Sequence, residues 1–192
     1  MPTEEPSIET DEKLAEVYLA LATQRFAGEL PCLLARLIAQ FAVLMRRTPT
    51  PRFPQLRYRS AEEFLLREGL AFRLKEPPRN VTMGERKQCF RNCYKRAVFS
   101  RRYAYCEGMA LGEPGHPPYR HAWLLDLTDG LAFDPTWRTR GDAYIGVVID
   151  EAYLAAVFPR AGCVIENVQA RWPILTGAAG HSWRHRWLAD RL

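Results

Sequence analysis

The fold and the candidate site of this chain depend on residues 87–137, which read KQCFRNCYKRAVFSRRYAYCEGMALGEPGHPPYRHAWLLDLTDGLAFDPTW. Cys89, His121 and Asp134 follow one another along this stretch. A cysteine that opens a helix, a histidine that opens one strand and an aspartate that closes the next have the order of a thiol nucleophile, its base and the residue that orients the base. The three are therefore candidate catalytic residues.

The apolar pattern around these residues predicts one helix followed by an antiparallel sheet. The helix carries its apolar residues on one face, at Phe90, Cys93, Tyr94, Ala97 and Val98. Residues 103–111 and 121–127 predict strands, and residues 131–133 predict the antiparallel partner of the second strand. Residues 144–149 predict a further short strand. This order indicates an α+β fold in which the cysteine helix packs on an antiparallel sheet.

The turn between the two central strands tests the arrangement of the histidine and the aspartate. A two-residue turn at Asp129 and Gly130 would set His121 opposite Arg138. For His121 to face Asp134, the strands must join through a wider loop whose centre lies two residues earlier. A catalytic triad predicts that wider loop.

The chain before the central stretch predicts a tail and a helical hairpin. Residues 1–12 hold five acids and no base, and they have too little apolar surface to fold, so we expect a disordered acidic tail. Residues 13–58 predict two antiparallel helices and a proline-rich connector, packed on the core. The second helix, residues 31–45, is apolar almost all round, which indicates deep burial or a homo-oligomer formed through it.

Residues 59–192 are expected to form the core itself. Ser60 and Glu63 make a capping box before a short helix. Residues 163–168 look strand-like after the sheet, and residues 180–192 predict a last, weakly amphipathic helix. The length of 192 residues fits one compact domain overall.

Composition and charge limit the class of partner. Hydrophobic residues make up 47% and charged residues 26% of the chain, as in ordinary globular proteins. The net charge of +5 is too modest to indicate nucleic acid, although residues 46–59 hold five arginines and no acid. No apolar run reaches the roughly 20 residues of a membrane span. We therefore expect neither nucleic acid nor membrane as a partner.

The cysteine count indicates free thiols in a reducing, cytoplasmic setting. The chain has five cysteines, and its first residues are acidic rather than leader-like. Cys93 lies one turn after Cys89, and a zinc site with Cys106, His116 or His121 is conceivable, but the spacing fits no standard zinc module. We expect no metal and no cofactor.

The predicted place of Cys89 suits a nucleophile. A thiol attacks a carbonyl carbon well only as the thiolate, and an ordinary cysteine with a pKa of about 8.5 is mostly protonated at neutral pH. The unpaired amides and the dipole of a helix N-terminus favour negative charge there, and Arg86 and Lys87 add positive potential. The same amides can donate to the oxyanion that forms on attack.

His121 is the best candidate base among the four histidines, because only it begins a predicted buried strand. Candidates for binding the oxyanion or the substrate are Gln88, Asn92, Glu107 and Trp123. Gln88 adjoins the nucleophile and Glu107 lies on a strand near it, whereas Trp123 also fits a place in the core.

Four short motifs resemble those of the transglutaminase-like branch of the papain-like cysteine hydrolase superfamily. They are QCFRN at 88–92, YAYCEGMAL at 103–111, RHAWLLD at 120–126 and AFDPTW at 132–137. That superfamily places Cys on a helix and His and Asp on adjoining strands. The resemblance spans about residues 84–148 and implies that Cys89 is the nucleophile, His121 the base and Asp134 its orienter. The chain also resembles uncharacterised bacterial and phage proteins with the motifs CFxN, HAW and DPTW. That resemblance does not indicate a substrate.

These observations predict a cysteine-dependent enzyme that performs acyl transfer through a thioester, to water or to an amine. Its substrate would be a peptide, a protein or a small amide or ester. The alternative is a catalytically inactive papain-like fold that serves as a basic binding module for an anionic or protein partner.

Overall fold

The computed structural model describes residues 11–47, 56–112, 116–138, 141–169 and 171–186. Within these ranges the elements follow in the order α1 (Asp11–Arg25), α2 (Glu29–Leu44), α3 (Ala61–Glu68), β1 (Leu70–Ala71), α4 (Cys89–Val98), β2 (Tyr103–Leu111), β3 (Tyr119–Asp126), β4 (Leu131–Phe133), β5 (Ala143–Val148) and α5 (Glu151–Ala161). The predicted α+β class is confirmed.

The strands form one antiparallel sheet in the order β1-β5-β2-β3-β4. β2 and β3 pair along their length, from Tyr103 opposite Asp126 to Ala110 opposite Tyr119. β5 is the last strand along the chain, yet it lies between β1 and β2. The sheet therefore consists of the meander β2-β3-β4, completed on its other side by strands that are distant in sequence.

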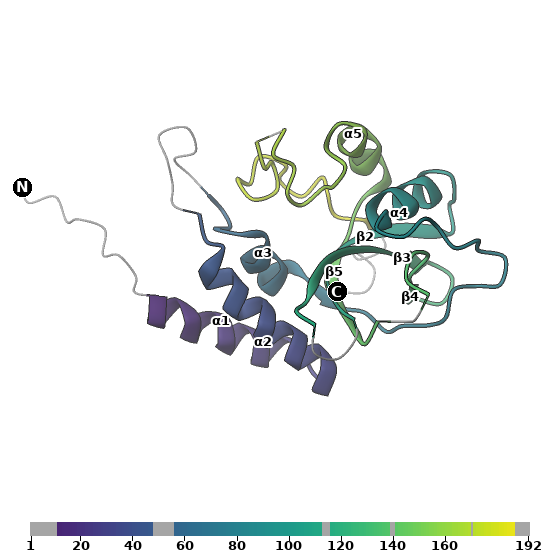
Figure 1. Ribbon diagram of the computed structural model, residues 1–192. Coiled ribbons are helices and arrows are strands. Elements are labelled where there is room, and N and C mark those ends of the chain that lie inside the picture. Colours follow the sequence, from purple (N-terminus) through teal and green to yellow (C-terminus); the bar gives the residue numbers. More distant parts are fainter. Residues whose placement is uncertain (1–10, 48–55, 113–115, 139–140, 170, 187–192) are drawn as a thin grey trace, which may run out of the picture.

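Helices pack against the sheet at two ends of the molecule (Figure 1). α1 and α2 lie side by side, and α2 and α3 contact β5. α4 contacts β2, β3 and α5. One cluster of buried side chains runs from Tyr18 on α1 through Ile38 and Phe64 to Ile145 on β5, so the helical hairpin packs on the same core as the sheet.

The second helix is buried on one face only. Leu34, Ile38 and Ala42 are fully buried, whereas Leu33 and Leu44 are 45% and 75% exposed. Burial thus accounts for part of its apolar surface, and a homo-oligomer through this helix stays a prediction. None of the helices in the described ranges is long and apolar enough to cross a bilayer.

Local hydrogen bonds explain where α3 begins. Ser60 Oγ accepts from the backbone amide of Glu63 at 3.0 Å, as the predicted capping box requires. The Glu63 carboxylate accepts from the amide of Arg59 at 2.7 Å, one residue before the usual partner in this motif.

Two predicted elements near the C-terminus are wrong. Residues 163–168 form bends and turns, because the amides of Val164 and Ile165 donate to the Glu107 carboxylate instead of to a strand. Residues 180–186 form turns and a bridge, because the carbonyl oxygen of Trp183 accepts from the amide of Asp150 at 2.8 Å. The rest of the predicted last helix, most of the predicted tail and most of the proline-rich connector lie outside the described residues.

Candidate active site

Cys89 is the first residue of α4, as its sequence context predicts. Gln88 is the residue that precedes the helix, and its side chain makes no capping hydrogen bond. Lys87 has a φ of 63°, in the left-handed region that side-chain-bearing residues rarely adopt. This strained turn brings the chain into the helix directly at Cys89, among the first amides of α4, which have no intrahelical acceptor.

The structure brings the three predicted residues together. His121 Nε2 lies 2.5 Å from Asp134 Oδ2, and both side chains are buried. Cys89 lies near enough to His121 to contribute to the raised pKa of its imidazole. Cys89, His121 and Asp134 therefore lie together, although 45 residues separate the first from the last in sequence.

The predicted register of β3 and β4 is wrong by one pair. Asp126 lies opposite Leu131, a register midway between the two-residue turn and the wider loop expected for a triad. The Asp126 side chain sets it, because Oδ1 accepts from the amide of Thr128 inside the loop at 3.1 Å. Asp134 follows the end of β4 and reaches His121 diagonally, so the two need not be direct strand partners.

Asp134 is held in place by its own turn. Oδ1 accepts from the amides of Thr136 and Trp137 at 2.7 and 3.1 Å. Oδ2, the oxygen that bonds His121, also accepts from the Tyr144 hydroxyl at 3.1 Å. Each oxygen therefore has two donors, and the carboxylate cannot rotate without losing them.

The Trp137 indole stacks on the imidazole of His121, with ring centroids 4.1 Å apart and an angle of 23° between the rings. It covers one side of the His121–Asp134 hydrogen bond, and exclusion of water strengthens such a bond. The sequence does not predict this role. The signal for it is local, because Trp137 ends the same turn that Asp134 begins.

The electrostatic surroundings favour a protonated His121. Burial lowers the pKa of its imidazole, but the hydrogen bonds and charges of Asp134 and Cys89 outweigh burial and raise the pKa to about 9. At neutral pH the ring is then an imidazolium.

Asn92 positions the site rather than donating to an oxyanion. Its amide nitrogen donates to the carbonyl oxygen of Glu85 at 2.8 Å and to Thr136 Oγ1 at 3.0 Å, which uses both hydrogens. A Cβ added to Gly84 would lie 2.3 Å from Asn92 Cγ, so only glycine lets the chain approach this closely. Asn92 thereby ties α4 to the loop before it and to the turn of Asp134.

Trp123 and Gln88, two further residues predicted to bind the oxyanion or the substrate, differ in their exposure to solvent. Trp123 is fully buried and stacks on Tyr144 with centroids 4.9 Å apart, so it belongs to the core. Gln88 is exposed at the start of α4, where its side chain is free to turn towards an oxyanion. Its role as a donor stays a prediction.

Glu107 anchors the segment that follows α5. Its carboxylate accepts from the amides of Val164 and Ile165 at 2.8 and 2.9 Å and from the Tyr105 hydroxyl at 2.7 Å. Burial raises the pKa of Glu107, although its three donors and the charge of Arg120 oppose the shift. The predicted substrate contact is thus first of all a structural anchor.

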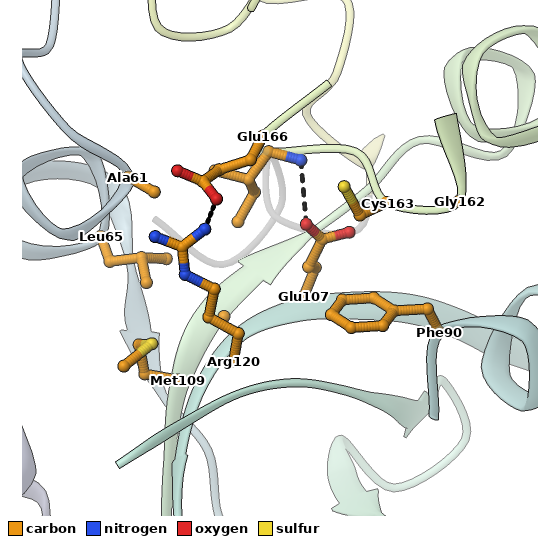
Figure 2. A pocket seen from close by; sticks show the side chains of 11 residues that line it. Ala61, Leu65, Phe90, Glu107, Met109, Arg120, Gly162, Cys163 and Glu166 are labelled. Atoms are coloured by element: carbon orange, nitrogen blue, oxygen red, sulfur yellow. Dashed lines mark hydrogen bonds and ion pairs between the residues drawn. The ribbon is translucent and has the colours of Figure 1, made fainter. Parts of the chain in front are cut away.

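Two hollows lie on either side of Phe90. One of about 350 Å³, the Phe90 pocket, is lined among others by Leu65, Phe90, Met109, Ile165, Glu107 and Arg120 (Figure 2). The other, of about 380 Å³, carries the exposed bases Lys87, Arg91 and Lys95 on its rim. Cys89 lines neither hollow and is 8% exposed.

In the part of the chain that the structure describes, no three His, Cys, Asp or Glu side chains converge as metal ligands. No family model, curated protein or solved structure matches the chain. The proposal for its function therefore depends on the geometry of the site and on the sequence words around it.

Proposed function

We propose that the protein is a cysteine-dependent acyl-transfer enzyme, an amide or peptide hydrolase or a transglutaminase-like transferase. One observation carries the proposal: His121 Nε2 lies 2.5 Å from Asp134 Oδ2, and Cys89 is near enough to His121 to contribute to the raised pKa of its imidazole. A nucleophile, a base and an orienting group in this sequence of contacts are the recurring arrangement of thiol acyl transfer.

The chemistry divides into two steps. The Cys89 thiolate attacks the carbonyl carbon of an amide or ester, and the His121 imidazolium gives its proton to the leaving amine or alcohol. This breaks the C–N or C–O bond and leaves a thioester on the sulfur. His121, now neutral, takes a proton from water or an amine, which attacks the thioester and releases the thiolate. Asp134 keeps the imidazole in the orientation that both steps need.

Oxyanion stabilisation would come from the start of α4. The first amides of a helix have no intrahelical acceptor, and they include the amide of Cys89 itself. We propose that these amides donate to the carbonyl oxygen as it gains negative charge, with the exposed Gln88 side chain as a second donor.

A papain-like core is part of the same proposal. A helix that begins at the cysteine packs on β2 and β3, while His121 lies on β3 and Asp134 follows β4. This arrangement, with the words CFxN, HAW and DPTW, supports a place in the transglutaminase-like branch of the superfamily.

The reactivity of the thiols provides the test. Cys32 is more exposed than Cys89, so exposure alone predicts that iodoacetamide alkylates Cys32 faster. The proposed function predicts the reverse at pH 6, where an ordinary thiol with a pKa of about 8.5 has less than about 1% thiolate. Peptide mass spectrometry after short exposures measures both rates in one sample. His121→Ala should slow Cys89 and leave Cys32 unchanged.

A substrate panel follows from the same reaction. Peptide amides and esters should be hydrolysed or transferred to an added amine by the wild type and not by Cys89→Ala. If Cys89 reacts no faster than Cys32 and no substrate is consumed, the chain is the basic binding module instead. That module predicts binding of an anionic partner that weakens steeply with salt.

A further inference from the structure

The Phe90 pocket is lined by the residue that follows the proposed nucleophile, and the inference about its ligand rests on the proposed function. Phe90 follows Cys89 in the first turn of α4. Arg120 precedes His121 on β3, and its side chain points to the other face of the sheet. Gly108, also in the lining, lies opposite His121 in the sheet. The volume of about 350 Å³ is at the lower end of the range of about 300–1,000 Å³ for ligand sites. It suits one side chain of a longer substrate.

The free surface of the pocket is apolar. Side chains from α3, α4, β2 and the segment after α5 converge there (Figure 2), and they are Ala61, Leu65, Phe90, Met109 and Ile165. An apolar ligand that covers these side chains removes apolar surface from water, and this favours its binding.

Arg120 and Glu107, two charged groups of the pocket, already have hydrogen-bond or ion-pair partners within the protein. Arg120 forms ion pairs with Glu166 and, at 2.9 Å, with Glu62. Glu107 accepts from two backbone amides and the Tyr105 hydroxyl. A charged ligand group would lose its water and would have to break one of these pairs to gain a partner.

We propose that the Phe90 pocket binds the side chain of the acyl-donor residue and selects an apolar one of the size of leucine, methionine or phenylalanine. With that side chain in the pocket, the scissile carbonyl lies towards Cys89, because Phe90 and Cys89 are consecutive residues. A lysine or glutamate side chain enters poorly, and glycine leaves the pocket unfilled.

Chloromethyl ketones of single acetylated amino acids test this selectivity. Their carbonyl takes the place of the scissile carbonyl, and the sulfur of Cys89 displaces chloride to form a thioether. We expect the leucine and phenylalanine reagents to alkylate Cys89 at least about 10-fold faster than the glycine, lysine and glutamate reagents, after division by their rates with free cysteine. Equal rates, or a faster lysine reagent, would overturn the proposal.

Filling the pocket provides a matched pair of variants. Ala61 lies at the start of α3 and lines the pocket, whereas Ala20 is exposed on α1. Ala61→Leu should reduce the leucine to glycine rate ratio by about 10-fold, and Ala20→Leu should leave the ratio as in the wild type. A ratio unchanged in Ala61→Leu would place the preference elsewhere.

Methyl NMR separates failure of the pocket from failure of the proposed function. Met109 lines the pocket, and Met45 is an exposed reference at the end of α2. In Cys89→Ala, N-acetyl-leucinamide should shift the Met109 methyl signal and not that of Met45, and N-acetyl-lysinamide should shift neither. This binding holds even if iodoacetamide shows no activated Cys89. If the leucine derivative fails to move Met109 while Cys89 is activated, the pocket inference alone is wrong.

Discussion

Two buried carboxylates with similar surroundings serve different ends in this molecule. Asp134 and Glu107 are 3% and 5% exposed, and each accepts from two backbone amides and a tyrosine hydroxyl. The difference is the fourth partner. Asp134 is hydrogen-bonded to the ring of His121. The hydrogen bonds described for Glu107 come from the amides of Val164 and Ile165 and from the Tyr105 hydroxyl, and they fix the segment after α5.

The comparison shows that burial and hydrogen bonding do not distinguish a site carboxylate from an anchor. The distinguishing feature is whether a partner can itself gain or lose a proton. Asp134 meets an imidazole that can gain or lose a proton, with a pKa of about 9, so its orientation affects chemistry. Glu107 meets amides and a tyrosine whose pKa burial raises well above its usual value, so it affects only the fold.

The largest expected effect is on stability, from Glu107→Ala. The substitution leaves three buried donors without an acceptor, and each costs about 1–3 kcal/mol, so we expect a loss of about 3–5 kcal/mol. Urea unfolding measures it. The exposed Glu76 offers the matched control, and Glu76→Ala should change stability by less than about 0.5 kcal/mol. A loss below about 1 kcal/mol for Glu107→Ala would contradict its role as an anchor.

The His121 side of the comparison predicts a pH dependence. The native pKa of about 9 lies above the value of about 6.5 for an unfolded histidine, so the native state holds the proton more tightly. The resulting stabilisation, about 3 kcal/mol, is fully present below about pH 6.5 and is lost as the pH rises through 9.

Unfolding at pH 6 and pH 10 measures this dependence as a difference between proteins. The advantage of the wild type over His121→Gln should shrink by about 3 kcal/mol between the two pH values. His116 is exposed, so the difference between wild type and His116→Gln should not change. An advantage that stays constant would mean that the native and unfolded states bind the His121 proton equally tightly.

Asp134→Asn should slow alkylation of Cys89 at pH 6 by about 100-fold. The amides of Thr136 and Trp137 require an oxygen at Oδ1, so the new NH2 group must face His121. It would donate to Nε2 and place the ring proton on Nδ1, where the base must accept one.

The control for this reversal is Asp142→Asn, an exposed aspartate to asparagine change. It should leave the alkylation rate within about 2-fold of the wild type, since surface substitutions have small effects. A wild-type rate in Asp134→Asn would show that the side chain turns over and that the two amides do not fix it.

The smallest effects come from a pair of tyrosine to phenylalanine changes, one in each network. Tyr105→Phe and Tyr144→Phe each remove one hydroxyl donor and should each cost about 1 kcal/mol of stability. Only Tyr144→Phe should also shift the pH profile of Cys89 alkylation, because its hydroxyl shares Asp134 Oδ2 with His121. An equal shift in both variants would erase the distinction between the two carboxylates.

Local patterns allowed much of the fold to be predicted. The bounds of β2 and β4 agree with the alternation of apolar residues and with the turn residues between the strands. The start of α4 at Cys89 and the cap at Ser60 are likewise local features. The juxtaposition of Cys89, His121 and Asp134 followed from the order of these elements.

Contacts between distant residues were beyond the reach of the same patterns. The strand predicted at residues 163–168 is replaced by turns because its amides bond a side chain 57 and 58 residues away. The register of β4 depends on how Asp126 caps its loop, and the stacking of Trp137 on His121 depends on that register. Asn92 looked like an oxyanion donor because its two acceptors lie in other segments.

The place of β5 in the sheet bears on the order in which the site matures during synthesis. Cys89 and His121 lie on α4 and β3, Asp134 follows β4, and Tyr144, which donates to Asp134, lies on β5. The wall of the Phe90 pocket needs Ile165, which leaves the ribosome a few seconds later at about 5–20 residues per second. We expect the nascent chain to bring its reactive thiol together before the pocket that selects the substrate side chain is complete.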